Sequence, residues 1–434
     1  MIIMVILATA DALIKSLINK YLKVSIQSPH LSPNQRAWQR FRKNKPAVFG
    51  LCWIALSVLI AVLGFLIAPD GTPNVNDQVS EVALSDPGFS IQMLKVRKNQ
   101  EYDSPNILSR MIFGKPNPYR QIPINNYEFR GDSIEVEVYE GLETGTKNLK
   151  KGQQYKFHLV DVVHPIDLSN SGFQNENNIV TFFNIKKQKE SVNFASLRQT
   201  IEQNLISKKS YLLGTDLHGR DVLSRLLLGV RISLLVGLIA VSISLTIGIF
   251  LGALAGYFGG KIDDAIMLLI NTVWSIPTLL LVFAIVLALG RGVGIIFLAV
   301  GLTMWVDVAR IVRGQVMALK GIQFVEAAQS MGFSTLRIIG RHILPNILGP
   351  VMVIAAANFA MAILIEAGLS YLGFGIKPPT PSWGTMLNEN YGYALSGKPF
   401  LALIPAFAIM FMVLAFNLVG NGIRDALDVK GQTG

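Results

Sequence analysis

The sequence has few charged residues and few residues suited to metal or disulfide chemistry. Only 15% of its 434 residues are charged, compared with about 25% in soluble domains. The single cysteine, Cys52, excludes a disulfide within the chain, and the five histidines are too scattered to indicate a metal cluster. We therefore expect a protein with no metal and no other cofactor.

The phosphate-binding pattern Gly-x4-Gly-Lys-Ser/Thr is also missing. Its nearest approach is Gly260-Lys261, where Ala255 replaces the first glycine and Ile262 replaces the hydroxyl residue. The chain therefore cannot bind ATP in that way, and no catalytic constellation replaces the pattern. We expect a protein that is not an enzyme and that draws any energy from ATP through a partner.

Long apolar runs are what the sequence does have. Residues 232–256, 265–290 and 400–423 contain no Asp, Glu, Lys or Arg. Each run is at least as long as the roughly 20 residues that a helix needs to cross a bilayer. The sequence predicts an all-α polytopic membrane protein with six transmembrane helices at about 47–68, 232–256, 265–290, 293–308, 348–372 and 400–422. The fourth is the weakest, because Asp307 interrupts it near its predicted end.

The distribution of charge argues against nucleic acid as a partner and predicts sidedness. The net charge is +11, yet residues 70–210 contain 17 basic and 17 acidic residues. The basic excess lies elsewhere, most densely just before the first apolar run, at Arg36, Arg40, Arg42, Lys43 and Lys45. Because basic loops stay in the cytoplasm, we place this segment on the cytoplasmic side of a bacterial inner membrane.

The alternation of spans then assigns a side to each segment of the chain. We predict an N-terminal cytoplasmic or interfacial segment (1–45), a first transmembrane helix (46–69) and an extracytoplasmic insert (70–210). A core (211–428) follows, which contains helices 2–6 and a cytoplasmic loop at 309–346, and the chain continues in a cytoplasmic tail (429–434). Residues 1–14 resemble a short signal-peptide core, but no basic residue precedes them. An interfacial amphipathic segment is favoured there. An over-extended start or a cleaved signal is the alternative.

The insert differs in character from the apolar core. Alternation at 133–139 and 155–160 predicts strands, and a stripe of apolar residues predicts a helix at 192–207. These patterns favour an α+β domain between helices 1 and 2. An extension lying on the membrane subunits is the alternative. His158 and His164 are interpreted as structural residues.

A polar stretch at 326–345 separates two apolar segments. Its pattern consists of Glu326, Ala327, Ala328, Gly332, Leu344 and Pro345. It resembles the EAA loop of the membrane subunits of ATP-binding-cassette (ABC) importers. Two alanines let a helix lie close to a partner, Gly332 ends that helix, and Pro345 suits the first turn of the next span. The resemblance implies that the loop docks on an ATPase subunit, with Glu326 as a charged contact or a cap.

A second motif narrows the family. Residues 213–227 resemble the LGTDxxGRDxxSRLL signature of the C-type subunit in the dipeptide/oligopeptide/nickel branch of ABC permeases, and the matching residues include Gly214, Thr215, Asp216, Gly219, Arg220, Asp221 and Arg225. Blocks at 32–45, 256–260, 275–277 and 378–384 are similar to the same subunit. The resemblance covers about 32–70 and 211–428, and implies the ABC importer permease fold. The charged residues of the motif are expected to form one of two kinds of ion pair. The pairs either fix the segment before the second membrane helix at the extracytoplasmic mouth of the permease, or they are exposed to solvent.

Four polar residues are predicted to lie at membrane depth, where such side chains are costly and often functional. They are Asn271, Asn358, Glu366 and Asn417. Glu366 is the sharpest candidate. Each could line a translocation path or bond to a neighbouring helix. Pro277 and Pro405 are expected to kink their helices.

The predicted function is that of a permease subunit in an ATP-driven importer of peptides. The resemblance implies a homologous B-type permease subunit, two cytoplasmic ABC ATPase subunits and an extracytoplasmic solute-binding protein as partners, within membrane lipid. Nickel chelates are an alternative solute. A non-transporting membrane scaffold and a secondary transporter are the rival functions. We hypothesise that the insert helps to dock the binding protein.

Overall fold

The computed structural model describes residues 32–102, 105–141, 152–167, 169, 172–176, 178–290 and 292–427. The predictions for residues 1–14 and for the tail at 429–434 lie outside these residues. The chain forms two compact units, one of residues 1–59, 234–369 and 409–434 and the other of residues 60–233 and 370–408. The predicted boundaries of the insert, 70 and 210, stay predictions.

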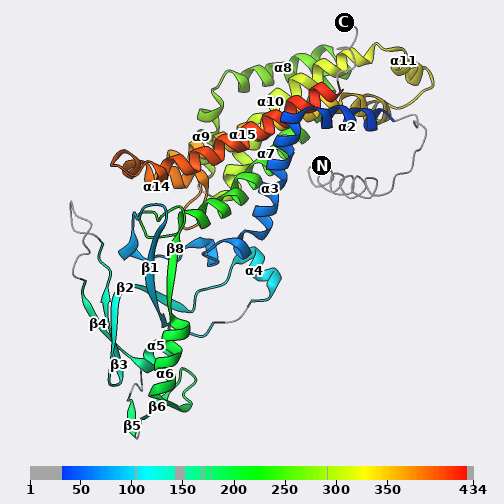
Figure 1. Cartoon of the computed structure of the whole chain (residues 1–434). Coiled ribbons are helices and arrows are strands. Elements are labelled where there is room, and N and C mark those ends of the chain that lie inside the picture. The colour runs from blue at the N-terminus through cyan, green and yellow to red at the C-terminus, as the bar shows by residue number, and fades with distance from the viewer. Residues whose placement is uncertain are drawn as a thin grey trace. The chain divides into compact units, whose positions relative to one another are not determined.

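The first unit is helical, and several of its helices continue into the second unit (Figure 1). The helices are α2 (Pro33–Lys43), α3 (Lys45–Ile67), α7 (Val222–Phe258), α8 (Gly260–Trp274), α9 (Thr278–Leu289), α10 (Val293–Lys320), α11 (Gln323–Ser330), α12 (Thr335–Arg337), α13 (Leu348–Tyr371) and α15 (Phe400–Leu427). A π-helical turn (Ile338–Ile343) and a 3-10 turn (Leu344–Ile347) join α12 to α13.

Five helices among the described residues are long and apolar enough to cross a membrane. A sixth span exists if α8 and α9, which are bent by 89° at their junction, count as one. The prediction of a single helix at 265–290 was therefore wrong. Pro277 lies at the break, where it cannot donate the backbone hydrogen bond that a continuous helix needs. By contrast, α15 continues through Pro405.

Two helices are longer than hydropathy predicts. The fourth predicted span ends near 308, but α10 continues to Lys320, so Asp307 lies inside the helix and not near its end. Similarly, α7 begins at Val222, ten residues before the charge-free run at 232–256. Hydropathy marks the apolar layer, whereas a helix can continue beyond that layer into water.

Small residues bring α7 and α10 close together. At Gly248, Gly252 and Gly256, an added Cβ would lie within 2.4–2.6 Å of the nearest atom of α10. This spacing of four residues places the three glycines on one face of α7, as in other membrane helix pairs with small-residue contacts. At one end, Arg313 of α10 donates two hydrogen bonds, of 2.5 and 2.6 Å, to Asp263 of α8.

The second unit contains an antiparallel sheet of five strands in the order β4-β3-β2-β1-β8. Its strands are β1 (Phe89–Arg97), β2 (Tyr119–Arg130), β3 (Ser133–Val138), β4 (Gln154–His158) and β8 (Ile206–Tyr211). A separate three-stranded sheet contains β5 (Gln174–Glu176), β6 (Ile179–Phe183) and β7 (Lys189–Asn193). Short helices complete the unit, namely α4 (Ile107–Phe113), α5 (Leu159–Val163), α6 (Phe194–Thr200) and α14 (Trp383–Leu395).

The predicted strands at 133–139 and 155–160 correspond to β3 and β4, although α5 begins at Leu159. The predicted helix at 192–207 is shorter, because it comprises α6 and a π-helical turn (Ile201–Leu205) before β8. Alternate residues of β3, such as Ile134 and Val136, are buried in one apolar core with Leu197 and Ile201. This core shows that the sheet and α6 pack together.

Candidate functional site

The short helix α11 carries the first part of the EAA-like pattern. Val325 and Ala328 are buried in a core with residues of α7, α10 and α13. Glu326 and Ala327 point the other way and are exposed. The expectation that both alanines could approach a partner is therefore corrected, because Ala328 already packs inside its own chain. Glu326 lies in the first turn of α11, where a carboxylate interacts favourably with the helix dipole.

Gly332 ends α11 as expected, with φ at +75°. The amide of Gly332 donates to the carbonyl of Gln329 at 2.9 Å, and the amide of Phe333 donates to the carbonyl of Ala328 at 3.2 Å. This pair of bonds is a Schellman motif, which satisfies carbonyls left unpaired at a helix end. Apart from its chain neighbours, no described residue has an atom within 4 Å of a Cβ added at Gly332, so the backbone conformation is what favours glycine there.

The chain then turns back into the membrane helix α13. Ile338, Ile339 and Ile343 are buried in the same core as α11. Pro345 occupies the first turn of the 3-10 segment that leads into α13, where its missing N–H costs little. Leu344 packs against the core. Movement of α11 would therefore be transmitted through packed side chains to α7, α10 and α13.

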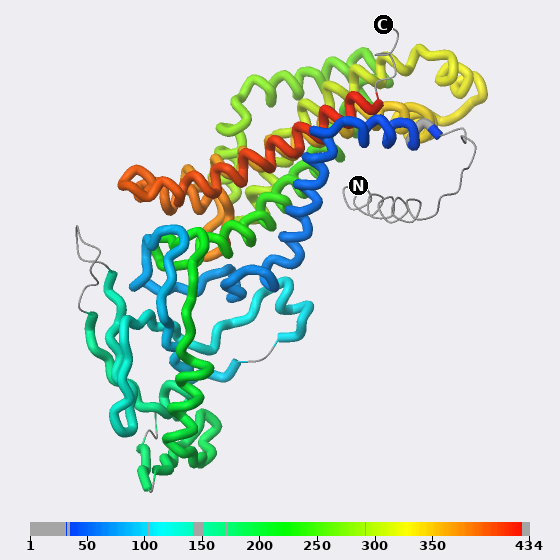
Figure 2. Tube along the Cα trace, viewed as in Figure 1, coloured from blue at the N-terminus to red at the C-terminus, as the bar shows by residue number. Residues whose placement is uncertain are grey.

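The EAA-like loop lies at the same end of the first unit as α2 and the last turns of α15 (Figure 2). The side chain of Asn44 donates to Asp425 at 3.1 Å, which joins the start of α3 to the end of α15. The basic cluster at 36–45 therefore occupies the end of the unit at which α11 lies. This arrangement supports the cytoplasmic side predicted for the loop.

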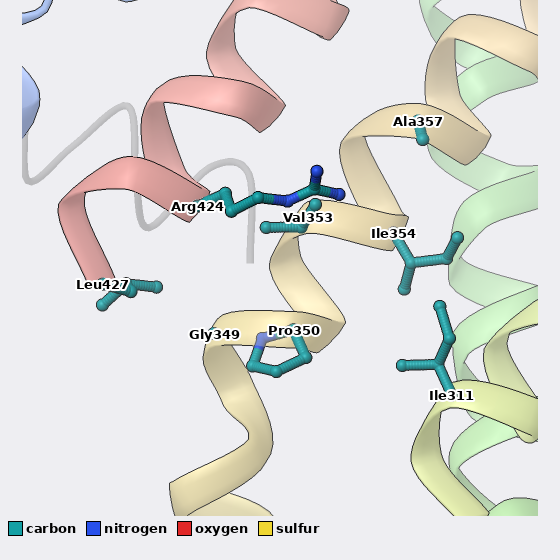
Figure 3. Close-up of a pocket in the computed structure, with 8 residues that line it drawn as sticks. All are labelled: Ile311, Gly349, Pro350, Val353, Ile354, Ala357, Arg424 and Leu427. Atoms are coloured by element: carbon teal, nitrogen blue, oxygen red, sulfur yellow. The ribbon is translucent and has the colours of Figure 1, made fainter. Parts of the chain in front are cut away.

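A cavity of about 360 Å³ opens between α10, α13 and α15. Its lining is mostly apolar and is formed by Ile311, Gly349, Pro350, Val353, Ile354, Ala357, Arg424 and Leu427. Arg424 extends from α15 toward α13, and among the described residues it is the one charged side chain in the lining (Figure 3). This part of the lining therefore offers a single anion-binding group.

The signature at 213–227 forms a buried ionic cluster in the second unit. Arg220 donates to Asp216 at 2.6 Å and to Glu389 of α14 at 2.6 Å. Arg225 lies 3.2 Å from Glu389 and 3.6 Å from Asp216. Both arginine side chains are at most 2% exposed, so the interpretation as exposed ion pairs was wrong. The cluster holds α14 to the start of α7.

Two further acids belong to this network. Asp221 accepts hydrogen bonds from the amide and hydroxyl of Ser224, and that hydroxyl accepts one from the amide of Asp70 at 2.9 Å. Burial raises the pKa of Asp221, although the bonds from Ser224 act in the opposite direction. Asp70 follows the end of α3, so the signature also anchors the segment that leaves the first membrane helix.

The signature's glycines allow close backbone contacts with that segment. Gly219 has φ at +70°, and an added Cβ would lie 1.8 Å from the carbonyl oxygen of Val79. Gly214 has φ at +74°, and a Cβ added there would lie 2.4 Å from the carbonyl oxygen of Ser85. Thr215, which is fully buried, accepts from the amide of Ser85 at 2.8 Å and donates to the carbonyl of Val82. In this chain, Gly214, Thr215 and Gly219 of the motif therefore hold the segment at 79–85.

The sequence reasoning missed Glu389 and did not assign a role to Trp383. The indole of Trp383 donates to the carbonyl of Leu226 at 3.0 Å, and its ring would be 2.8 Å from a Cβ added at Gly229. Glu389 is the only acidic residue of α14. A single acidic residue in this segment was the available sign that Glu389 has a role, but nothing in the sequence indicates that Arg220 and Arg225 are its partners.

The four polar residues predicted at membrane depth divide into two pairs. Glu366 and Asn358 are buried in α13, and Asn358 donates to the carbonyl of Met304 in α10 at 3.4 Å. Asn271 and Asn417 are exposed. Asn271 accepts a hydrogen bond of 3.4 Å from Arg310. A residue that lines a path between two subunits must be exposed on either subunit alone, so this division favours Asn271 and Asn417 over Glu366 for that role.

Comparison with known proteins identifies the class. A model of the N-terminal transmembrane domain of oligopeptide transport permease C matches residues 32–85, and a model of the binding-protein-dependent transport system inner membrane component matches residues 248–430. The first match includes Val79, Val82 and Ser85, which contact the signature. The chain belongs to the family of binding-protein-dependent transport system inner membrane components, and it is a multi-pass inner-membrane permease subunit of the ABC importer class.

Individual relatives agree with this assignment. The dipeptide transport system permease protein DppC of Bacillus subtilis is 43% identical over 235 residues, which are 54% of this chain and 73% of the relative. The oligopeptide transport system permease protein OppC of Escherichia coli K12 is 42% identical over 223 residues, 51% of this chain and 74% of the relative. DppC of Lactococcus lactis is 28% identical over 409 residues, 93% of each chain, so this match extends through the insert.

Among solved structures, a chain of the inward-facing MetNI methionine ABC transporter is similar over 47% of this chain and 96% of its own length. That similarity has a TM-score of 0.40 and 20% sequence identity.

Proposed function

We propose that this permease subunit forms half of the translocation path of an importer for dipeptides and oligopeptides. The relatives named for these solutes support peptides as the cargo. A homologous B-type permease would supply the other half of the path. Two cytoplasmic ATPases would supply energy, and an extracytoplasmic binding protein would deliver the peptide.

The observation that carries the proposal is the two-sided geometry of α11. One face, with Val325 and Ala328, is fixed in the core of the first unit, and the other, with Glu326 and Ala327, is free to contact an ATPase. Such a helix transmits motion because its inner face cannot slide independently of the membrane helices.

The test is peptide uptake in proteoliposomes that contain the chain with its co-purifying subunits and internal ATP. We expect ATP-dependent uptake of labelled short peptides, competed by unlabelled peptides and not by a nickel chelate. Glu326→Lys combined with Gly332→Asp should abolish uptake while the protein stays folded. Uptake that survives this double substitution would contradict coupling through α11, and competition by the nickel chelate alone would contradict the peptide cargo.

We further propose that the α+β insert forms part of the docking platform for the binding protein. Its position between α3 and α7, on the predicted extracytoplasmic side, supports this role. Deleting 75–205 would also remove Val79, Val82 and Ser85, which hold the signature. Ile179→Asp combined with Lys189→Glu is a sharper test, because both side chains are exposed on the three-stranded sheet, whereas Val180 and Phe182 of that sheet stay in place in the core of the insert. Normal affinity for the binding protein would then exclude this exposed surface from the platform.

A further inference from the structure

The helix α4 exposes most of its apolar side chains. Of its seven residues, Ile107, Leu108, Ile112 and Phe113 are 60–73% exposed, and none of the seven is buried. Fully burying one such side chain is worth about 1.5–3 kcal/mol. Four of them on one short helix indicate an apolar environment that residues 32–427, as far as they are described, do not provide.

Arg231 fixes α4 to the end of the first membrane helix. Its guanidinium donates to the carbonyls of Met111 and Ile112 in α4, at 2.6 and 3.0 Å. The same group donates to the carbonyls of Ala61 and Val62 in α3, at 2.5 and 3.2 Å. The helix α4 therefore lies beside the last two turns of α3, which is about 10 Å of that helix at 1.5 Å per residue.

The apolar surface of α4 continues the membrane-facing surface of α3. Val62 and Ile67 of α3 are both more than half exposed, and α3 is one of the helices long and apolar enough to cross a membrane. A lipid that covers these residues of α3 is also within reach of α4. This continuity identifies the apolar surroundings of α4 as the bilayer and not as a soluble partner.

A basic cavity adjoins α4. It has a volume of about 500 Å³, and its charged lining residues are Asp70, Asp77, Lys95, Arg110, Lys115, Lys208 and Lys209. Arg110 belongs to α4, and Lys115 follows it and donates its amide to the carbonyl of Gly71 at 2.8 Å. The five cations outnumber the two carboxylates in this lining.

The two carboxylates and one of the lysines are already engaged. Asp77 accepts from Gln121 at 2.6 Å and from Asn117 at 3.3 Å, and Lys209 lies 3.7 Å from it. Asp70 accepts from the amides of Thr72 and Asp77. In the part of the chain that the structure describes, the other four cations of the lining form no ion pair within 4 Å. They are Lys95, Arg110, Lys115 and Lys208.

We propose that α4 and this cavity form a binding site for an anionic phospholipid in the leaflet on the insert's side of the membrane. The apolar side chains of α4 enter the acyl region, and Arg110 and Lys115 bind the phosphate at its edge. Arginine binds phosphate in a bidentate manner, and lysine binds it as a point charge. The site holds the base of the insert at a fixed depth in the membrane.

The first test measures whether lipid reaches α4. A nitrobenzoxadiazole dye is attached to Leu108→Cys in a Cys52→Ser background, in the full-length chain with its co-purifying subunits in nanodiscs. Tyr155→Cys on β4, which is 47% exposed, is the matched control. We expect phospholipid with a nitroxide near the headgroup to quench the dye severalfold more at 108 than at 155. Equal quenching, or a blue-shifted dye at 108 without quenching, would show that water or protein covers α4 and would overturn the proposal.

The second test measures headgroup selectivity. Arg110→Gln with Lys115→Gln is compared with Lys156→Gln with Lys189→Gln, a pair of exposed lysines on β4 and β7. A cation near a membrane surface contributes about 1 kcal/mol to binding, which is about fivefold in affinity. The protein with both Arg110→Gln and Lys115→Gln should therefore bind phosphatidylglycerol about 25-fold more weakly than the parent protein. The control pair should bind as the parent does. If the parent protein binds phosphatidylcholine as tightly as phosphatidylglycerol, or if inorganic phosphate fully displaces phosphatidylglycerol, the proposed site for an anionic lipid is overturned.

Discussion

Glu389 of α14 accepts a hydrogen bond from Arg220 at 2.6 Å, although 169 residues separate the two in the sequence. The side chain of Arg220 is 2% exposed and that of Glu389 is 14% exposed. Because Arg225 shares the same carboxylate, Glu389 is one of two carboxylates, with Asp216, that pair with both buried arginines. The family signature at 213–227 therefore depends on a residue outside it.

Replacing Glu389 with Gln should strongly destabilise the second unit. The substitution leaves buried arginine charge uncompensated, which typically costs about 3–5 kcal/mol. Thermal unfolding of the purified protein in detergent measures the effect. Lys398→Gln is the control, because it removes an ion pair to Asp86, which is 70% exposed, and should cost at most about 1 kcal/mol. Equal effects of the two substitutions would contradict the buried cluster.

Gly219→Ala should cost more stability than Gly131→Ala. Both glycines have positive φ, so alanine at either position bears the cost of the left-handed conformation, about 1–2 kcal/mol. At Gly131 the added Cβ meets nothing within 4 Å, whereas at Gly219 it collides with the carbonyl oxygen of Val79. The difference between the two melting temperatures isolates this contact. A smaller effect at 219 than at 131 would refute it.

Gly332→Ala should reduce ATP-driven uptake, and Gly340→Ala should not. Neither position places an atom within 4 Å of the new Cβ, so sterics are matched. Only Gly332 has positive φ, and alanine there strains the turn that ends α11. At Gly340, alanine favours the helix by up to about 1 kcal/mol. Uptake assays in proteoliposomes compare the two, and equal uptake would show that the turn is not required.

Acidification should destabilise the sheet of the insert through His158. Burial lowers the pKa of His158 below its usual 6.5, despite the nearby Asp132. The unfolded chain then binds more protons, so stability is full above pH 6.5 and falls as the pH drops toward the folded pKa. In its neutral form, the Nδ1 atom of His158 accepts from the amide of Val160 at 3.3 Å.

The measurement is the melting temperature between pH 7.5 and 5.5. His158→Asn keeps an acceptor for the start of α5 and does not titrate near neutral pH. This variant should lose part of the pH dependence and leave the part due to His164, whose pKa burial also lowers. An unchanged slope in the variant would exclude His158 as a source.

Local patterns in the sequence predicted local structure well. Glycine after a short polar helix predicted the positive φ at Gly332, and alternation predicted β3 and β4. These features depend on residues a few positions apart. Hydropathy located the apolar segments, but it did not show the break between α8 and α9. It also did not give the ends of α7 and α10, because a helix continues wherever its backbone bonds are satisfied.

Contacts between distant residues could not be predicted in the same way. The partner of Arg220 is 169 residues away, and Ala328 faces inward only because α7 and α10 surround α11. Charge alone left open whether the arginines and carboxylates of the signature form fixed pairs or exposed ones. Its burial follows from Gly214 and Gly219, whose missing side chains let the segment at 79–85 cover it.

Cross-linking from α11 tests whether the exposed face of this helix contacts an ATPase subunit. In a Cys52→Ser background, Ala327→Cys and Ala328→Cys are each labelled with a benzophenone maleimide, and the assembled importer is irradiated. We expect a cross-link from position 327 to an ATPase subunit, and little labelling and no such cross-link at the buried position 328. A transport-competent complex in which position 327 cross-links to no ATPase, or in which both positions cross-link equally, would contradict it.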